Sequence, residues 1–403
     1  IRAMIAAVRT GSKRLSEVIE RYGLSVTLGV IQEILDQGER MSRAAIRRIP
    51  NGTYAAEAIL DGDGNDDAPL DEHIRLKVKI TVEDERVVID FTGTDRQCRG
   101  PMNVPLPSTI SSARYGFKIV TTPHLPNNEG FFRPLKIIVP EGSLLNPRFP
   151  AATAMWPAPT TTIPDLMLKA LAPAIPNRVR GGHFGDSMAD FIYGTDPRTG
   201  KYYVCAEPDG GGYGGKPYED GESALFSMDL GDTYNVPAEV AEVRYPWRVE
   251  RFELIRDSGG PGKFRGGLGV RRDYRIIGHK AGLTVTTDRV NYTPPWGLFG
   301  GKDARSNITV VYRHDGREER WRKVSNLPLE PDDVVSFQTG GGGGYGSPLE
   351  RDPQLVLQDV INGYVSLAAA QAEFGVVLDG QAMKVDIEAT ERLRRKMSEP
   401  ARE

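Results

Sequence analysis

The sequence predicts a mixed α+β fold with largely antiparallel β-structure, Gly/Pro-rich loops and helices mainly at the two ends of the chain. Alternating apolar and polar runs are joined by short turns, whereas a parallel sheet would need regular crossover helices. The 403 residues include 45 glycines and 29 prolines, which favour turns and irregular loops over a helical bundle. Helical spacing of apolar side chains is found near both termini.

The two ends of the chain are predicted to be helical segments, residues 1–50 and 351–403. In the first, apolar side chains recur at helical spacing within 12–22 and again over 28–35, and Asn51-Gly52 ends the segment. In the second, three helical runs are expected, at residues 355–360, 367–374 and 387–397.

The segment 51–180 is predicted to be β-rich and proline-rich. Residues 74–82 alternate between apolar and polar, and 87–91 return as a second strand after a turn, so the pattern predicts a β-hairpin. Residues 100–165 carry many prolines, which neither donate to a β-ladder nor continue a helix. We expect that stretch to be extended, irregular and firmly packed.

The segment 181–350 is predicted to be a glycine-rich β region that carries the candidate site loops. Strand-like runs lie between the glycine clusters, for example at 283–287 and 308–312. The second of these runs precedes a turn at His314-Asp315-Gly316.

Composition excludes several classes of protein. The formal net charge is -3, so no global field favours nucleic acid or an anionic membrane. No apolar run reaches the ~18 residues of a membrane helix, and the first residues do not resemble a secretory signal. Two cysteines, Cys98 and Cys205, do not make a disulfide scaffold. We therefore expect a reducing compartment, the cytoplasm.

Glycine runs raise the question of phosphate binding. Gly340 to Gly344 expose bare backbone N–H groups, but no Lys-Ser/Thr pair follows, so the run is not a P-loop. Structural tight turns are the favoured interpretation. Gly210, Gly211 and Gly212 are nevertheless the candidate substrate-binding backbone.

Histidines give no metal motif within this chain. The five histidines include no H-x-H or H-x-x-x-H pair, and no C-x-x-C is present, so we assign no metal ligand here. His183 is the candidate for substrate binding because the flanking glycines expose its imidazole. A hydrogen-bonded structural histidine is the favoured alternative.

The candidate catalytic residues are Glu207, Asp257 and Arg265. We expect the glycine-rich loops 207–215 and 257–269 to approach each other and to line a ligand cavity or a subunit interface. Arg265 would contact a carboxylate or phosphate, and Asp257 would orient it. In the competing interpretation Asp257 and Arg265 lock a turn together.

Longer sequence motifs resemble the hydantoinase B/oxoprolinase family. The resemblance is collinear from about residue 10 to residue 395. The motifs that carry it are Asp90–Thr94 (DFTGT), Gly100–Asn103 (GPMN), Pro140–Pro147 (PEGSLLNP), Asn235–Glu242 (NVPAEVAE) with Tyr245-Pro246, Asp257–Gly269 (DSGGPGKFRGGLG), Gly341–Gly346, Pro348–Pro353 (PLERDP), Gly363–Ser366 (GYVS) and Phe374–Val377 (FGVV).

The resemblance implies partners and cofactors. Family members pair this B-type subunit with an A-type ATP-binding subunit of actin-like fold, so ATP and Mg²⁺ are expected in the partner subunit. Members also carry an upstream region rich in Gly, His and Asp, which we associate with a divalent metal. That region is expected on a separate chain or outside this sequence, and a higher hetero-oligomer without nucleic acid or membrane is expected.

The resemblance leaves the reaction open. The first possibility is an ATP-dependent cyclic-amide hydrolase that acts on hydantoin, 5-oxoproline or a lactam. The second is an ATP-dependent ketone carboxylase of the acetone or acetophenone type. A third is a non-catalytic scaffold for the ATP-binding subunit, and we rank it last because loops often carry function.

Overall fold

The computed structural model describes residues 1–64, 73–188, 190–206, 208–228, 230–231, 233–380 and 383–399. Within these ranges the chain is a mixed α+β structure, and every strand pairing but one is antiparallel. This agrees with the predicted fold class. No helix in the described ranges combines the length and the apolar composition that crossing a membrane requires.

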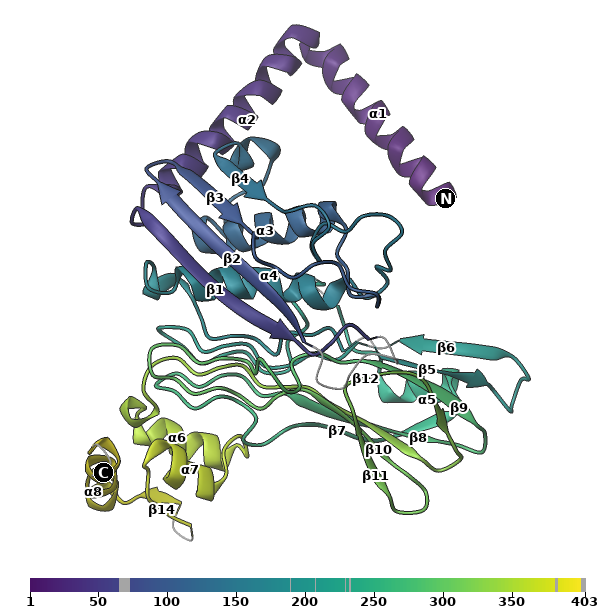
Figure 1. The fold of residues 1–403 in the computed structure, drawn as a ribbon, viewed down its shortest axis with the longest axis vertical. Helices are drawn as coiled ribbons and strands as arrows, with labels where there is room; N and C mark the ends of the chain where they lie inside the picture. Colours follow the sequence, from purple (N-terminus) through teal and green to yellow (C-terminus); the bar gives the residue numbers. More distant parts are fainter. Residues whose placement is uncertain are drawn as a thin grey trace.

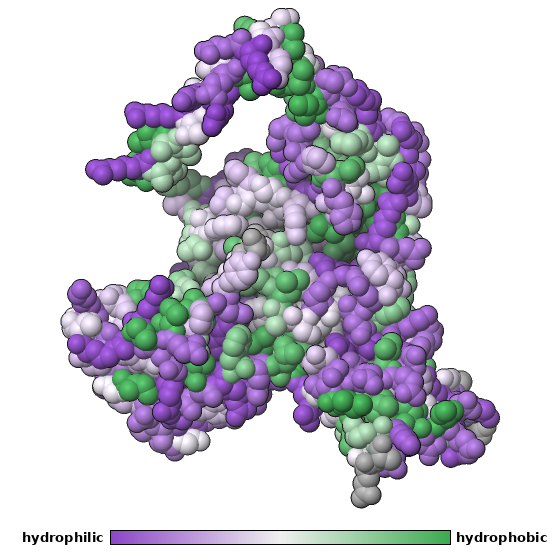
Figure 2. All heavy atoms as spheres, turned by 180° about the vertical axis from the view of Figure 1, so that it is seen from behind, coloured by the Kyte–Doolittle hydropathy of each residue, from purple (hydrophilic) through white to green (hydrophobic). Residues whose placement is uncertain are grey.

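The N-terminal segment is a helical arm that projects from the body of the protein (Figure 1). It consists of α1 (Arg2–Tyr22) and α2 (Leu24–Ile46), which meet at Gly23 with φ 82°. Both predicted helices are confirmed, although the first begins at Arg2, ten residues before the start of the predicted range 12–22. No residue of α1 is buried, and Figure 2 shows apolar side chains on the surface of this arm.

A four-stranded sheet follows the arm. Its strands lie in sequence order, β1 (Gly52–Leu60), β2 (Ile74–Glu83), β3 (Arg86–Asp90) and β4 (Leu135–Ile138). The predicted hairpin is β2–β3, and the tight turn places Asp84 at φ 51°. Only β3 and β4 run parallel. Alternate residues of β2 are buried, so one face of the sheet is apolar and the other is exposed.

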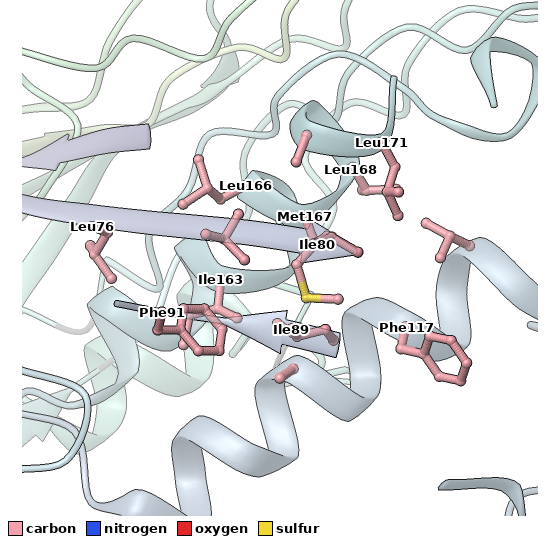
Figure 3. Packing of buried hydrophobic residues seen from close by; sticks show 14 of the residues in the cluster. Leu76, Ile80, Ile89, Phe91, Phe117, Ile163, Leu166, Met167, Leu168 and Leu171 are labelled. Atoms are coloured by element: carbon pink, nitrogen blue, oxygen red, sulfur yellow. The ribbon is translucent and has the colours of Figure 1, made fainter. Parts of the chain in front are cut away.

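Two helices cover the apolar face of this sheet, α3 (Leu106–Thr121) and α4 (Pro157–Leu171). Figure 3 shows the packing. Leu76 and Ile80 of β2 face Leu166 and Met167 of α4, with Phe117 of α3 alongside. Short 3-10 turns at Glu129–Phe132 (η1) and Pro176–Arg178 (η2) complete the layer.

The prediction of irregular structure over 100–165 was therefore wrong for these two helices. Prolines stand in the first turn of both helices, where the missing N–H has no intrahelical partner to lose. Pro164 lies inside α4. Burial of nearly the whole of α4 supplies the packing that outweighs its weak helical propensity.

Residues 191–338 form a sandwich of two antiparallel sheets. One has the order β12-β9-β5-β6 and the other β11-β10-β13-β8-β7. Side chains of both sheets share one core, which includes Leu283 and Ile192 from the first sheet and Tyr274, Val311 and Phe337 from the second. The bounds are β5 Phe191–Thr195, β6 Tyr202–Ala206, β7 Trp247–Leu254, β8 Val270–Ile276, β9 Ala281–Thr286, β10 Ile308–Tyr312, β11 Glu318–Trp321, β12 Lys323–Leu329, β13 Val334–Gln338, and the short helix α5 Ala238–Arg244.

The C-terminal segment is a small helical unit with its own apolar core, which includes Val356, Val365 and Phe374. All three predicted helices are present, as α6, α7 and α8. The bounds in this segment are η3 Pro348–Glu350, α6 Pro353–Ile361, α7 Leu367–Phe374, β14 Leu378–Asp379, β15 Lys384–Val385 and α8 Ile387–Ser398.

Candidate functional site

The glycine-rich segments lie side by side in a bundle between the first sheet and the sandwich, where Figure 1 shows them as a layer of extended strands without arrows. Backbone hydrogen bonds join each segment to several others: Gly215 N donates to Gly343 O, Gly343 N to Gly182 O, and Gly342 N to Gly267 O, at 2.8, 2.8 and 3.0 Å. We call this layer the glycine bundle. Its segments are 181–186, 210–215, 258–269, 297–302 and 340–346.

Glycine is required in the bundle because neighbouring backbones approach too closely for any side chain. A Cβ atom on Gly266 would lie 1.6 Å from the carbonyl oxygen of Gly342, and one on Gly214 would lie 1.8 Å from that of Gly181. The obstructing atoms are backbone, which cannot turn aside as a side chain can. The glycines are therefore a packing requirement of the fold.

The bundle uses the N–H groups of the five-glycine run itself. Gly340 N donates to Asn307 Oδ1, and the N–H groups of Gly341 to Gly344 donate to backbone carbonyls in four other segments. None of the five is left to hold a phosphate. The run is structural, as favoured, but it is extended backbone and not the tight turns that were predicted.

The two predicted site loops do approach each other within the bundle. Gly267 N donates to Tyr213 O at 2.8 Å, and a Cβ on Gly212 would lie 2.1 Å from Gly267 O. Gly211 N and Gly212 N already donate to Leu225 O and Gly340 O, and Gly210 is buried. Binding of a substrate by Gly210, Gly211 and Gly212 stays a prediction. Glu207 lies outside the described residues.

Arg265 is held in a buried network of two arginines and two aspartates. Its Nε donates to Asp359 Oδ1 at 2.9 Å, and its Nη1 donates to its neighbour's carbonyl, Gly266 O, at 3.0 Å. Arg351 bridges the same Asp359 at 2.7 Å and binds both oxygens of Asp220 at 2.6 and 2.7 Å. Burial opposes the charge of Arg351, but Asp220 and Asp359 outweigh it and raise the pKa of its guanidinium.

The carboxylate that Arg265 contacts is Asp359 of this chain, whereas the prediction concerned a carboxylate or phosphate of a ligand. Asp257 does not orient Arg265. Asp257 Oδ1 instead accepts from Ser366 N at 2.7 Å, its own N–H donates to Tyr364 O, and its φ is 60°. Both residues therefore fasten the C-terminal helical unit to the bundle. The competing interpretation, in which Asp257 and Arg265 lock a turn together, is right that both have structural contacts. It is wrong that they pair with each other, since each has a different partner.

A pocket of about 540 Å³ lies between the glycine bundle and the C-terminal helical unit. Asp257, Arg265 and Lys302 line it from the bundle side, and Tyr364 and Glu373 from the helical side. Of the predicted site residues that the structure describes, Asp257 and Arg265 border this cavity, and Gly210, Gly211, Gly212 and His183 do not. Arg265 Nε already donates a hydrogen bond to Asp359. A direct catalytic role for Arg265 therefore stays a prediction.

A second pocket, of about 440 Å³, lies between α3 and α4. Its lining is neutral and rich in hydroxyl groups, with Ser111, Ser112 and Thr160 beside Tyr115 and Trp156. The sequence does not reveal this pocket, because serines on a helix give no distinctive pattern.

His183 is completely buried, at 0% exposure. Its Nδ1 lies 3.1 Å from Asp165 Oδ2, and Arg289 Nη1 donates to that same oxygen at 2.8 Å and to His183 O at 2.6 Å. Burial lowers the pKa of His183, so the imidazole is neutral at pH 7. Burial opposes the charge of Asp165, but His183 and Arg289 hold its pKa below the usual value. This cluster joins α4 to the bundle, which fits the structural alternative; substrate binding by His183 stays a prediction.

Buried aspartates form another cluster, which the sequence did not reveal. Burial raises the pKa of Asp186 to about 7 and that of Asp190 to about 6, and burial together with Asp288 raises the pKa of Asp61 to about 6. Lys323 Nζ lies 2.8 Å from Asp288 Oδ2. Most of their oxygens accept from backbone N–H groups, as when Asp61 accepts from Val290 and Asn291. Across the described ranges, no group of three or more His, Cys, Asp or Glu side chains is arranged to hold a metal ion.

Comparison with known proteins identifies relatives along the whole chain. The family model of hydantoinase B/oxoprolinase matches residues 1–348. The B-type component of a D-/L-hydantoinase from Pseudomonas sp. (strain NS671) is 33% identical over 402 residues, which are 98% of this chain and 67% of that relative. The chain thus spans about two-thirds of the length of this curated relative.

Solved structures agree in fold. The ATP-dependent caprolactamase from Pseudomonas jessenii superposes with a TM-score of 0.88 at 28% identity, over 98% of this chain and 68% of that one. Acetone carboxylase in its nucleotide-free state gives a TM-score of 0.86 at 19% identity, over 96% of this chain and 57% of that one. The family match covers most of the chain, and two motifs of the resemblance, Asp257–Gly269 and Gly341–Gly346, lie in the glycine bundle, so this chain belongs to the hydantoinase B/oxoprolinase family.

Proposed function

We propose that this chain is the B-type subunit of an ATP-dependent cyclic-amide hydrolase and acts only with an A-type, ATP-binding partner subunit. The observation that carries the proposal is the similarity to the caprolactamase structure, at a TM-score of 0.88 and 28% identity. The match to the B-type hydantoinase component at 33% identity supports it independently. Both relatives are named for action on cyclic amides.

The proposed chemistry explains the need for ATP. Resonance between nitrogen and carbonyl makes an amide a poor electrophile. Transfer of the γ-phosphoryl group of ATP to the amide oxygen removes that resonance. Water can then add to the carbon, the ring C–N bond breaks as the nitrogen takes a proton, and the resulting acyl phosphate is hydrolysed to a carboxylate and phosphate.

The five-glycine run does not offer a phosphate loop for ATP, and the described side chains do not offer a cluster for Mg²⁺. The N–H groups of Gly340–Gly344 all donate within the bundle, and the described residues include no cluster of metal-ligating side chains. This supports the assignment of ATP and Mg²⁺ to the partner subunit and of any divalent metal to the upstream region. A hetero-oligomeric, cytoplasmic enzyme is part of the same proposal.

The pocket between α3 and α4 suits an uncharged cyclic amide. Among the described residues, the hydroxyl groups of Ser111 and Ser112 make no hydrogen bond, so they are available to an amide N–H or carbonyl. The ring carbons would contact Trp156 and Tyr115. We assign substrate contact to this pocket in preference to the bundle loops, whose polar groups are already paired.

The test compares substrates in the assembled enzyme. The chain would be co-purified with its A-type partner, and ADP release measured with hydantoin, 5-oxoproline, caprolactam, or acetone with bicarbonate. We expect ADP release with a cyclic amide and without bicarbonate. Release only with ketone and bicarbonate would instead establish the carboxylase, for which the 19% identical structure supports the fold alone. Equal ADP release when Ser111 and Ser112 are both replaced by Ala would remove the pocket assignment.

A further inference from the structure

A pocket of about 910 Å³ lies at the end of the sandwich that adjoins the glycine bundle. Two of its lining residues, Arg305 and Asn307, accept hydrogen bonds from the N–H groups of Gly341 and Gly340. The chain crosses from one sheet to the other at Arg322, between β11, an edge strand of the five-stranded sheet, and β12, an edge strand of the four-stranded sheet. Residues before β10 and after β9 close the other sides. The labels β10, β11 and β12 mark the region in Figure 1.

Four cationic side chains line this pocket: Arg305, Arg320, Arg322 and Lys323. None of the lining residues that the structure describes is acidic. Like charges brought together at a surface repel one another, so an unoccupied cluster of this kind is unfavourable in itself. The protein as a whole carries a formal charge of -3, which makes the local concentration of positive charge a specific feature.

Two of the four cations are neutralised within the chain. Lys323 Nζ binds Asp288 at 2.8 Å, and Arg320 Nε binds Glu318 at 2.9 Å. The other two lack a carboxylate. Arg305 donates to the neutral side-chain oxygen of Gln338 at 2.5 Å, and Arg322 makes no ion pair or side-chain hydrogen bond with any described residue.

The pKa of Arg305 is lowered, as expected for a partly buried cation that lies near other cations and has no described carboxylate partner. Partial removal from water lowers the pKa of its guanidinium, and the positive charges of Arg271 and Arg320 lower it further. A bound anion would reverse the effect of those neighbours. Ser306 and Asn291 also line the pocket and add neutral hydrogen-bonding groups, and Tyr292 adds an aromatic ring.

From this arrangement we infer that the pocket is a binding site for a phosphate group, carried by inorganic phosphate or by a small phosphate monoester. The arginine fork matches phosphate oxygens, and two uncompensated guanidinium groups match the roughly two negative charges of phosphate better than the single charge of a carboxylate. The inference does not depend on the proposed function, because phosphate binding can be measured without turnover.

The test is titration calorimetry of the purified protein with inorganic phosphate, phenyl phosphate and benzoate at constant ionic strength. We expect both phosphates to bind and benzoate to bind at least about ten-fold more weakly. Because a charge-assisted hydrogen bond contributes about 1.5–3 kcal/mol, Arg322→Gln and Arg305→Gln should each raise the Kd for phosphate about ten-fold or more. Tighter binding of phenyl phosphate would identify a phosphate ester as the ligand, and equal binding would identify free phosphate.

Arg317→Gln is the matched control. Arg317 is an exposed arginine near the β10–β11 turn, does not line the pocket, and pairs with Asp315. Its replacement should leave the Kd unchanged. Arg322 makes no described side-chain contact, so Arg322→Gln should fold normally even if Arg305→Gln does not. Absence of phosphate binding, benzoate binding as tight as phenyl phosphate, or a Kd unaffected by Arg322→Gln would each overturn the inference.

Discussion

Replacing Gly266 by alanine tests whether the glycine bundle is a packed core. The new Cβ atom would lie 1.6 Å from Gly342 O, and the closest distance that real Cβ atoms show is about 3.0 Å. The two backbones would have to separate by more than an ångström, while other segments hold both of them. Gly342 O accepts from Gly260 N, Gly342 N donates to Gly267 O, and Gly266 N donates to Gly260 O.

The expected loss follows from those three hydrogen bonds. At about 0.5–1.5 kcal/mol each, with about 1–3 kcal/mol more for overpacking, the free energy of unfolding should fall by roughly 2.5–7.5 kcal/mol. That is a large part of the roughly 5–15 kcal/mol typical of a folded domain. Urea denaturation followed by tryptophan fluorescence and circular dichroism measures it.

Gly29→Ala is the matched control, because Gly29 lies inside α2 with nothing within 4 Å of the position of its Cβ atom. There the same change should be neutral or should stabilise the helix by about 0.5–1 kcal/mol. A loss below about 1 kcal/mol for Gly266→Ala, or equal losses at both positions, would refute the description of the bundle as a close-packed backbone core.

Three further predictions concern buried charge and the hydroxyl-lined pocket. Burial raises the pKa of Asp190 to about 6, so between about pH 4 and 6 this carboxyl is protonated in the folded protein and ionised in the unfolded chain. The free energy of unfolding should therefore fall by up to about 3 kcal/mol as the pH rises from about 4 through 6. Asp190→Asn should remove that fall, as measured by urea denaturation at about pH 4.5 and about pH 7.5. Asp359→Asn leaves two buried arginines short of a partner and should lower the unfolding free energy by about 3–5 kcal/mol. Asp315→Asn, in an exposed pair, should have a much smaller effect. Replacing Ser111 and Ser112 together by Ala should raise the KM for the cyclic amide about ten-fold without shifting the melting temperature.

Each of these has an outcome that would contradict it. A pH dependence that Asp190→Asn leaves unchanged would mean that other carboxyl groups, such as Asp186, dominate the effect. Equal effects of Asp359→Asn and Asp315→Asn would mean that the arginine network does not hold the C-terminal unit in place. An unchanged KM for the double serine variant would place the substrate elsewhere.

The pattern of apolar and polar residues within short segments predicted much of the secondary structure. The alternation over residues 74–82 and the helical spacing over 367–374 are properties of neighbouring residues, and both elements are observed as β2 and α7. The helix α4 was not predicted, because its prolines argue against a helix locally and only its burial against the first sheet overrides them.

The partners of the candidate site residues could not be predicted in the same way. Asp257 and Arg265 were identified, but their partners Ser366 and Asp359 lie about a hundred residues away along the chain. The periodicity of apolar residues gives no information about contacts between residues so far apart along the chain. His183 likewise contacts Asp165, which sits in an apolar run that gives no sign of a buried carboxylate.

The proposed amide hydrolysis is tested most directly by the stoichiometry of the assembled enzyme. ADP and the ring-opened amino acid would be quantified with ATP and a cyclic amide, using this chain with its A-type partner, each of the two alone, and the pair with and without bicarbonate. We expect equal amounts of ADP and amino acid only when both chains are present, and no effect of bicarbonate. Turnover by this chain alone, or ATP consumption that requires a ketone and bicarbonate, would contradict the proposal.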